Sequence, residues 1–321
     1  MFVIDFELPY FGRKITDNMI TLARHIAKGV TKQQPVLSLL ARAMSSESYT
    51  TLNVTRPREY VVHVEMNRPD KRNAMNGAFF SEIGACFQKL SDDSDCRVVV
   101  LSGAGKIFTA GLDLMDLGNV IAIRESEKTD IGRKAVQLRK FLTNWQENFS
   151  QIEKCGKPVI AAIHSACVGG GVDLTSACDV RYCSEDAWFQ IKEIDLGLAA
   201  DLGTLQRFPK VIGNDSYARE LAFTARKFYA DEAKQMGFVS RILPDKDSLL
   251  DAALDMAALI ASKSPIAVQG TKASMVYSRD HSVQEGLEHI GIWNQSMLQS
   301  SDMTDAAMAQ MQKKEAKFSK L

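Results

Sequence analysis

Apolar runs of strand length alternate with amphipathic stretches through the first two thirds of the chain. The runs lie at residues 60–66, 97–103 and 158–163, with shorter ones at 180–183 and 188–191. Between them, apolar side chains recur at helical spacing near residues 75–87 and over about 134–154. Strand-length runs joined by helical stretches predict an α/β fold.

Beyond about Asp201 the pattern becomes almost wholly helical, interrupted by prolines and glycines. It predicts separate helices over residues 249–262 and 265–278. We therefore expect an N-terminal extension (1–52), an α/β core (53–245) and a C-terminal helical region (246–321). The last helices are too few to form a core by themselves, so they must pack on the core or on a neighbouring subunit.

The composition is that of a globular protein and excludes several classes. Of the 321 residues 45% are hydrophobic, and 39 Lys and Arg balance 39 Asp and Glu. A net charge of zero argues against a surface that neutralises many phosphates, so no nucleic-acid partner is expected. No apolar run reaches the ~18 residues of a membrane span. The cysteines and histidines show no metal-binding spacing, so neither a metal site nor a disulfide framework is expected.

The N-terminal extension has the composition of a mitochondrial transit peptide. Residues 18–46 contain no acidic side chain, while Arg24, Lys28, Lys32 and Arg42 interrupt apolar positions at helical spacing. Three acidic residues precede this stretch, and an extension without a targeting role is the alternative.

The chain ends in Ser319-Lys320-Leu321, the tripeptide that a peroxisomal import receptor reads at a free C-terminus. The residues before it are basic and polar, so we expect the tail to be accessible. The two ends together predict a peroxisomal protein with mitochondrial delivery as a second destination.

Two glycine-rich segments, residues 106–114 and 164–174, each follow a predicted strand. Their small residues let backbone N–H groups approach a ligand oxygen, and glycines 169–171 open a predicted short helix. Two such donors converging on one carbonyl oxygen form an oxyanion hole. Tight strand-to-helix packing explains either segment equally well by itself. Neither matches the phosphate-binding patterns G-x-G-x-x-G or G-K-[ST].

Taken in order, the motifs resemble the crotonase (enoyl-CoA hydratase/isomerase) superfamily. The matching pieces are residues 67–69, 73–76, 110–114, 169–171, 178–181 and 203–210. The resemblance implies a crotonase-like spiral of ββα units with a C-terminal helical trimerisation region, assembled as a homohexamer of two trimers. It also implies an acyl-CoA substrate and no cofactor beyond the CoA that the substrate carries.

The resemblance also implies where the thioester lies. Its oxygen would be held by the backbone N–H groups of Leu112 and Gly170, so that an enolate forms during the reaction. The substrate-binding residues would be Ala110, Gly111, Leu112, Asp113 and Leu114, together with Gly170. Arg68, Lys71 and Arg72 are candidates for the CoA phosphates, although a charged loop is commonly just solvated.

Three carboxylates would face the acyl group. Hydratases of the superfamily carry two acids, at the positions of Asp173 and Glu193, and this chain adds Asp201 in an otherwise apolar loop. This trio resembles the dienoyl-CoA isomerases of the superfamily, which implies moving a 3,5-diene into conjugation with the thioester. One proton leaves C2 and another arrives at C6, so one acid must be ionised and another protonated.

Each acid also has a structural interpretation. Asp173 falls in the first turn of a helix, where a carboxylate is favourable without catalysis. Asp201 is placed to be a helix N-cap, and Glu193 and Asp195 could form a solvated strand end. The rival functions are enoyl-CoA hydration, with Asp173 and Glu193 positioning a water, and a non-catalytic binding scaffold.

Overall fold

The computed structural model describes residues 49–127 and 129–321. The predicted transit peptide lies outside the described residues, and the compact unit spans Tyr49–Leu321. Its elements, in chain order, are β1 (Leu52–Arg58), β2 (Val61–Met66), the 3₁₀-helix η2 (Pro69–Lys71), α3 (Gly77–Asp92), β3 (Val98–Gly103), η3 (Leu114–Leu117), α4 (Gly118–Glu125), α5 (Ile131–Lys154), β4 (Val159–Ile163), β5 (Ala166–Val168), α6 (Gly170–Ser176), β6 (Val180–Ser184), β7 (Trp188–Gln190), η4 (Glu193–Leu196), α7 (Thr204–Ile212), α8 (Asp215–Thr224), β8 (Phe228–Tyr229), α9 (Ala230–Gln235), β9 (Arg241–Leu243), α10 (Lys246–Ala261), α11 (Pro265–Ser278), α12 (Val283–Met297) and α13 (Ser301–Met311).

The main sheet has six strands in the order β1-β2-β3-β4-β6-β9. Only β1 and β2 are antiparallel, and every other neighbouring pair is parallel. The carboxyl ends of β2, β3, β4 and β6 therefore meet at one edge, from which the glycine-rich segments leave β3 and β4. The α/β prediction is confirmed.

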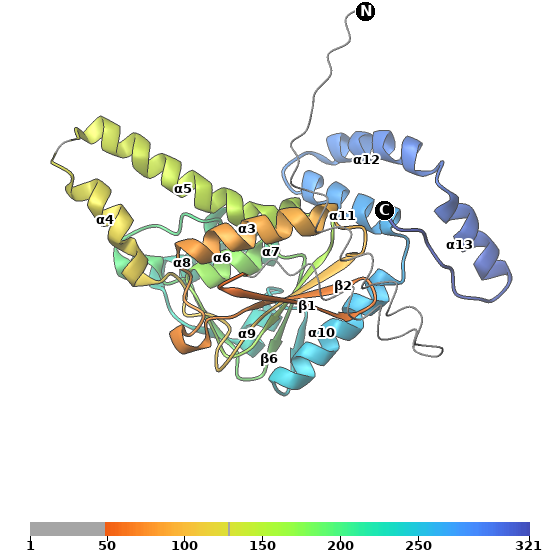
Figure 1. Cartoon of the computed structure of the whole chain (residues 1–321), viewed down its shortest axis with the longest axis horizontal. Coiled ribbons are helices and arrows are strands. Elements are labelled where there is room, and N and C mark those ends of the chain that lie inside the picture. Colours follow the sequence, from red (N-terminus) through yellow and green to blue (C-terminus); the bar gives the residue numbers. More distant parts are fainter. Residues whose placement is uncertain (1–48, 128) are drawn as a thin grey trace, which may run out of the picture. The chain divides into compact units, whose positions relative to one another are not determined.

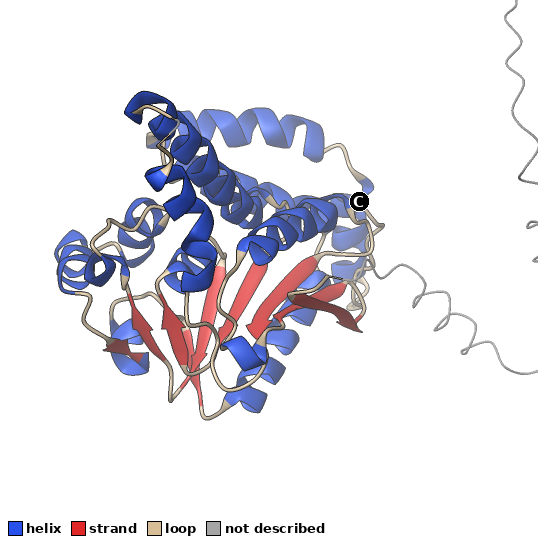
Figure 2. Cartoon of the chain, turned by 60° about the vertical axis from the view of Figure 1, so that its left-hand side comes forward, coloured by secondary structure: helices blue, strands red, loops and turns tan. Residues whose placement is uncertain are grey.

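Helices cover both faces of this sheet, as Figures 1 and 2 show. Alternate residues of a strand point to opposite faces. Val62 and Val99 thus belong to the core beneath α3 and α5, whereas Val61 and Val98 belong to a second core under α10. Every residue of β3 is buried, which explains the apolar run Val98–Leu101. The first helix of the predicted C-terminal region is therefore part of the packing of the sheet.

Aromatic stacking fixes the long helix α5. The Trp145 ring stacks on the Phe80 ring of α3 with centroids 4.0 Å apart, and the Phe149 ring lies 5.1 Å from the Phe80 ring. Asp130 caps the helix, since its carboxylate accepts the Arg133 amide at 3.0 Å. The first half of α5 extends from the body together with α4 (Figure 1).

A second sheet of three strands, in the order β5-β7-β8, stands beside the first. Phe189 of β7 and Phe228 of β8 stack at 5.1 Å, and Phe208 of α7 packs 5.0 Å from Phe238. This aromatic cluster supports the segment that carries Glu193 and the following loop.

Four strands, β1, β5, β8 and β9, differ from the sequence prediction, and β5 consists of three residues inside the second glycine-rich segment. β1 is an edge strand whose residues are mostly exposed, so its sequence is polar and lacks a buried run. β8 and β9 contain two and three residues, too short to produce a periodic pattern. The expectation of an almost wholly helical chain beyond Asp201 is wrong at these two strands, whereas the helix expected over 265–278 coincides with α11.

The C-terminal helices α11–α13 carry many exposed apolar side chains, among them Met275, Val283, Leu287, Ile292 and Met311. The tail then returns to the body. The Arg97 guanidinium donates to the carbonyls of Phe318 and Ser319 at 2.7 and 3.1 Å, and Lys320 forms an ion pair with Asp95. The side chains of the last three residues stay exposed. None of the helices in the described segments is long and apolar enough to span a membrane.

Candidate active site

The two glycine-rich segments lie side by side, joined by main-chain hydrogen bonds. The Phe108 amide donates to the His164 carbonyl at 2.9 Å, and the Thr109 amide donates to Ala166 at 3.0 Å. The Val168 amide returns a bond to the Thr109 carbonyl at 3.2 Å. Segments about 60 residues apart in sequence are thereby held in a fixed register.

Leu112 directs its amide away from this ladder. The Met75 amide donates to Gly111 at 2.8 Å, and the Asp113 amide donates to Met75 at 2.9 Å. Because successive peptide groups of an extended segment point to opposite sides, the Leu112 N–H faces away from Met75. In the described part of the chain, neither the Leu112 nor the Gly170 amide donates to a main-chain carbonyl. Both amides are available to a ligand.

Gly111 lets these two amides approach each other. Its φ is +88°, and a Cβ there would lie 2.7 Å from the Val168 carbonyl oxygen and 3.7 Å from the Gly170 nitrogen. Only glycine fits such a position. Gly170 begins α6, so the partial positive charge of a helix N-terminus adds to its N–H. The arrangement has the form of an oxyanion hole.

The remaining residues of the 110–114 segment differ in surroundings. The Asp113 carboxylate is turned to the protein: it accepts the Arg68 guanidinium at 2.9 Å and the Met115 amide at 3.2 Å. Arg68 is thus engaged in holding this loop, whereas Lys71 and Arg72 are exposed. Ala110 and Leu114 are also exposed. Asp113 therefore has a clear structural role beside any contact with substrate.

Asp173 projects from α6 and is 1% exposed. Its Oδ1 accepts the amide of Thr204, the first residue of α7, at 2.6 Å. This bond compensates an unpaired amide at the start of α7 and fixes the carboxylate. Asp173 therefore has two structural roles. It lies in the first turn of α6, as the sequence predicts, and it also accepts an amide at the start of α7.

Glu193 begins η4, directly after the small sheet. Its Oε2 is buried and has no hydrogen-bond partner among the described residues. A buried carboxylate oxygen without a donor favours the protonated form of the acid.

The three acids influence one another's ionisation. Burial raises the pKa of Glu193 to about 7, and the neighbouring charges of Asp173 and Asp201 add to that rise. Burial also raises the pKa of Asp173. The charge of Asp201 adds to this rise, whereas the hydrogen bond from the Thr204 amide opposes it. Because Asp173 accepts the Thr204 amide at 2.6 Å whereas Glu193 Oε2 has no partner among the described residues, we assign the proton to Glu193 and the charge to Asp173. The pKa of Asp201 is raised by burial.

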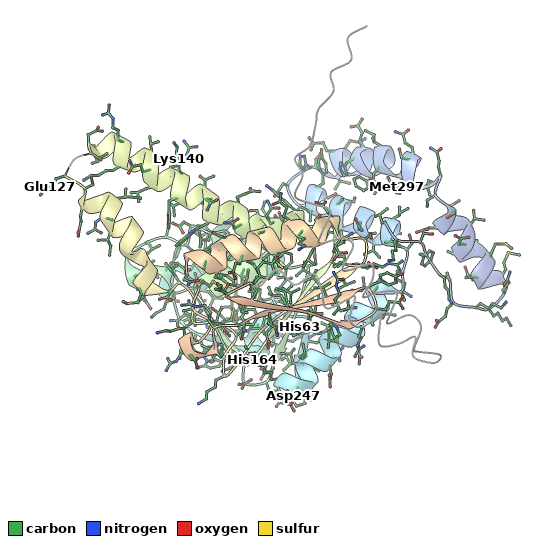
Figure 3. The ribbon with its side chains drawn as sticks, in the orientation of Figure 1. His63, Glu127, Lys140, His164, Asp247 and Met297 are labelled. Atoms are coloured by element: carbon green, nitrogen blue, oxygen red, sulfur yellow. The ribbon has the colours of Figure 1, made fainter. Side chains whose placement is uncertain are left out.

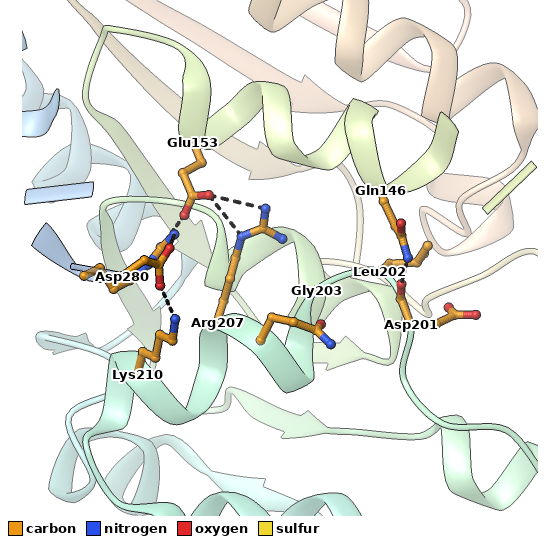
Figure 4. Close-up of a pocket in the computed structure, with 10 residues that line it drawn as sticks. Gln146, Glu153, Asp201, Leu202, Gly203, Arg207, Lys210 and Asp280 are labelled. Atoms are coloured by element: carbon orange, nitrogen blue, oxygen red, sulfur yellow. Dashed lines mark hydrogen bonds and ion pairs between the residues drawn. The ribbon is translucent and has the colours of Figure 1, made fainter. Parts of the chain in front are cut away.

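Asp201 is not a helix N-cap. The N-cap of α7 is Gly203, two residues later, and Asp201 lies in the preceding loop. Its carbonyl accepts the side-chain amide of Gln146 at 2.7 Å. Figure 4 shows its carboxylate directed away from Arg207 and Glu153, which line the same cavity of about 450 Å³. The sequence did not identify Gln146, since nothing local marks its contact with a loop 55 residues away.

Other polar clusters lie apart from the acids. Asp195 forms an ion pair with Lys192, an exposed pair in which the carboxylate is a spectator. His63 and His164 lie beside the start of α10, where Asp247 is located (Figure 3). His63 Nε2 is 2.7 Å from Ser102 Oγ, and burial lowers the pKa of His164 to about 4. Within residues 49–127 and 129–321 no three His, Cys, Asp or Glu side chains gather as metal ligands.

This geometry agrees with comparisons to known proteins. A family model described as enoyl-CoA hydratase/isomerase matches residues 56–320. The chain belongs to the enoyl-CoA hydratase/isomerase family. That is the superfamily identified from the motifs, and the match covers both glycine-rich segments and all three acids.

Relatives within the enoyl-CoA hydratase/isomerase family include proteins named Delta(3,5)-Delta(2,4)-dienoyl-CoA isomerase. The mitochondrial protein of Rattus norvegicus is 57% identical over 281 residues, covering 87% of this chain and 85% of that protein. The human mitochondrial protein is 54% identical over 296 residues, covering 91% and 90%. The peroxisomal protein of Arabidopsis thaliana is 47% identical, covering 87% and 100%.

Solved structures of the same family share the fold. The enoyl-CoA hydratase of Bacillus anthracis aligns with a TM-score of 0.76 at 28% identity, covering 84% of this chain and 99% of that one. A probable enoyl-CoA hydratase/isomerase of Mycobacterium abscessus gives 0.73 at 31% identity, covering 84% and 98%. The crotonase-like α/β architecture is therefore confirmed.

Proposed function

We propose that the protein isomerises 3,5-dienoyl-CoA to 2,4-dienoyl-CoA in the oxidation of unsaturated fatty acids. The observation that carries this proposal is the third acid: Asp201 joins Asp173 and Glu193 close enough to alter their ionisation. A hydratase needs two acids to position one water, whereas a proton shift between C2 and C6 needs an acid and a base at separate ends of a diene. The identities of 47–57% to proteins named for this isomerisation support the same conclusion.

The oxyanion hole lowers the main barrier in this proposal. A C2–H bond next to a thioester is weakly acidic, and its loss places negative charge on the thioester oxygen. The N–H groups of Leu112 and Gly170 would donate hydrogen bonds to that negatively charged oxygen. Each such donor contributes about 2.7–4 kcal/mol to transition-state stabilisation. Residues 110–114 would form the wall beside the thioester. No cofactor is needed for this step, since the CoA belongs to the substrate.

The acids then divide the proton transfer. Because Glu193 carries the proton in this assignment, Asp201, whose pKa is raised by burial, is the base that takes the proton from C2. The electron pair of that C–H bond moves into the dienolate, and Glu193 gives its proton to C6. Asp173 keeps Glu193 protonated by its neighbouring charge and by its own fixed position. Exchange of a proton between the acids or with water restores the starting state.

The assembly and destination are part of the same proposal. The exposed apolar side chains of α11–α13 support a homohexamer built from two trimers. The terminal Ser319-Lys320-Leu321 supports recognition by a peroxisomal import receptor, and the basic extension supports mitochondrial delivery as well. Relatives are named for both compartments.

Ultraviolet spectroscopy tests the activity directly. Purified protein mixed with a 3,5-dienoyl-CoA should produce the absorbance of a conjugated 2,4-dienoyl thioester. A parallel sample with a 2-enoyl-CoA should lose its enoyl absorbance far more slowly. Fast hydration of the second substrate without a change in the first would return the assignment to hydratase, and inactivity toward both would favour a binding scaffold.

A further inference from the structure

The loop that carries Asp201 is attached to the protein by few directional contacts. Ala200 and Leu202 are buried on either side of Asp201 and fix how deeply the loop lies. Within residues 199–202, one backbone group bonds to another segment of the described chain: the Asp201 carbonyl, which accepts the Gln146 amide at 2.7 Å. Burial of two small apolar side chains leaves the loop free to slide, because the hydrophobic effect has no direction. The hydrogen bond removes that freedom.

Gln146 stands on a rigid support. It follows Trp145, whose ring is 6% exposed and stacks on Phe80 at 4.0 Å. Phe149, one turn later in α5, packs on the same Phe80 ring. The aromatic core between α3 and α5 therefore fixes the helix backbone from which the Gln146 side chain projects.

We infer that Gln146 is a positioning residue for the proton transfer, acting through the main chain of Asp201. The Gln146 amide bonds the carbonyl, while the Asp201 carboxylate is directed away from Arg207 and Glu153, on the other side of the cavity that Gln146 and Asp201 both line (Figure 4). Gln146 thus leaves the carboxylate free for substrate and fixes the Cα from which it projects. This inference rests on the proposed isomerase function, because it assigns Asp201 the role of base.

The contribution is expected in turnover and not in binding. The thioester end of the substrate would be held by Leu112 and Gly170, on segments joined to each other by main-chain bonds. Their bond nearest to this loop runs from the Thr204 amide to Asp173, beyond residues 199–202. A displaced base lengthens the distance over which the proton must move, and a misplacement of about 1 Å can cost up to ~10²-fold in rate. The fold should be little affected, since the Gln146–Asp201 hydrogen bond is exposed and the net contribution of such a bond to stability is small.

Gln146→Met tests this, since methionine matches glutamine in length and lacks the donor. We expect kcat for the 3,5-dienoyl-CoA to fall about tenfold with KM and melting temperature nearly unchanged. Gln146→Lys, which restores a donor of sufficient reach, should recover most of the lost turnover. The matched control is Gln151→Met on the same helix, where the side chain bonds only Glu147; it should leave kcat unchanged.

The outcomes separate the two hypotheses. If the unmodified enzyme does not isomerise the diene, the proposed function fails irrespective of Gln146. If it does and Gln146→Met turns over normally, the positioning role is wrong. An equal loss in Gln146→Lys, or a loss that appears in KM or in melting temperature instead of kcat, would equally overturn it.

Discussion

Gly169 and Glu193 pack against each other, so that the oxyanion segment and the proposed proton donor form one unit. A Cβ on Gly169 would lie 3.2 Å from Glu193 Oε1, and the φ of Gly169 is +51°. The Gly169 amide also donates to the carbonyl of Gln190, at the end of the strand that leads to Glu193. A change at this glycine must therefore move the acid.

Gly169→Ala should lower activity more than its cost in stability explains. The added methyl group strains the backbone by roughly 1 kcal/mol and also displaces the Glu193 carboxylate. Gly213→Ala is the matched control, because Gly213 has φ +65° and open space around its Cβ position. Thermal unfolding should show the larger loss in Gly169→Ala, because Gly169 has ψ −119° and lies outside the left-handed helical region that Gly213 occupies with ψ 16°. When kcat is measured on fully folded protein, it should fall at least ~10-fold only in Gly169→Ala. Equal kcat values would show that the contact with Glu193 is unimportant.

Asp201→Asn should remove the base without unfolding the protein. The residue does not cap α7, so the substitution should leave the melting temperature within a few degrees. Loss of a general base should lower kcat by ~10²–10⁴ with little change in KM. Steady-state kinetics beside a thermal scan checks both, and near-normal turnover would refute the role of Asp201.

Two substitutions at Asp173 should separate its two functions. Asp173→Asn keeps the oxygen that accepts the Thr204 amide, so stability should be retained, whereas Asp173→Leu leaves that amide unpaired at a cost of about 1–3 kcal/mol. Removing the Asp173 charge lowers the pKa of Glu193. The basic limb of the kcat–pH profile, which reports loss of the Glu193 proton, should thus move to lower pH in Asp173→Asn. An unmoved limb would mean that Asp173 does not influence the donor.

Stability should decrease with rising pH because of Glu193. Its pKa is raised from 4.5 to about 7 in the folded protein by burial first. Between these values the folded state binds more protons than the unfolded state, so the free energy of unfolding falls as pH increases. Glu193→Gln removes this dependence. Urea denaturation at pH 5 and pH 8 should show the variant gaining on the natural protein at the higher pH, and a constant difference would contradict the pKa shift.

Removal of Ser319-Lys320-Leu321 should abolish peroxisomal delivery. A fluorescent fusion truncated after Phe318 should lose its puncta. Its melting temperature should change little, because the truncation removes the Arg97 bond to Ser319 but keeps that to Phe318, and the lost Lys320–Asp95 pair is exposed, where such pairs contribute ~0–1 kcal/mol. Adding one residue after Leu321 is the control: it preserves the Arg97 and Asp95 contacts but eliminates the free tripeptide. Persistent puncta in both fusions would show that the targeting signal lies in another part of the chain.

The sequence by itself determined the position of those helices and strands whose faces are each either wholly buried or wholly exposed. The run at β3 is apolar from Val98 to Leu101 because both faces of that strand are buried, and the spacing in α5 and α11 reflects one packed face each. The motifs around Gly111 and Gly170 could also be recognised from the sequence, since only glycine allows two backbone segments to approach each other so closely. The acids were found as residue types at family positions. Their partners were not.

Tertiary structure decided what those residues do. Asp173 caps α7 through Thr204, 31 residues away, and Asp201 is held by Gln146, 55 residues away. Such contacts leave no periodic trace, because a single hydrogen bond between distant segments imposes no repeat on either one. The ionisation of Glu193 likewise depends on burial and on two charges brought near it by folding. Local sequence encodes which face of an element is apolar, whereas the distances between elements, and hence the pKa values, exist only once the chain has folded.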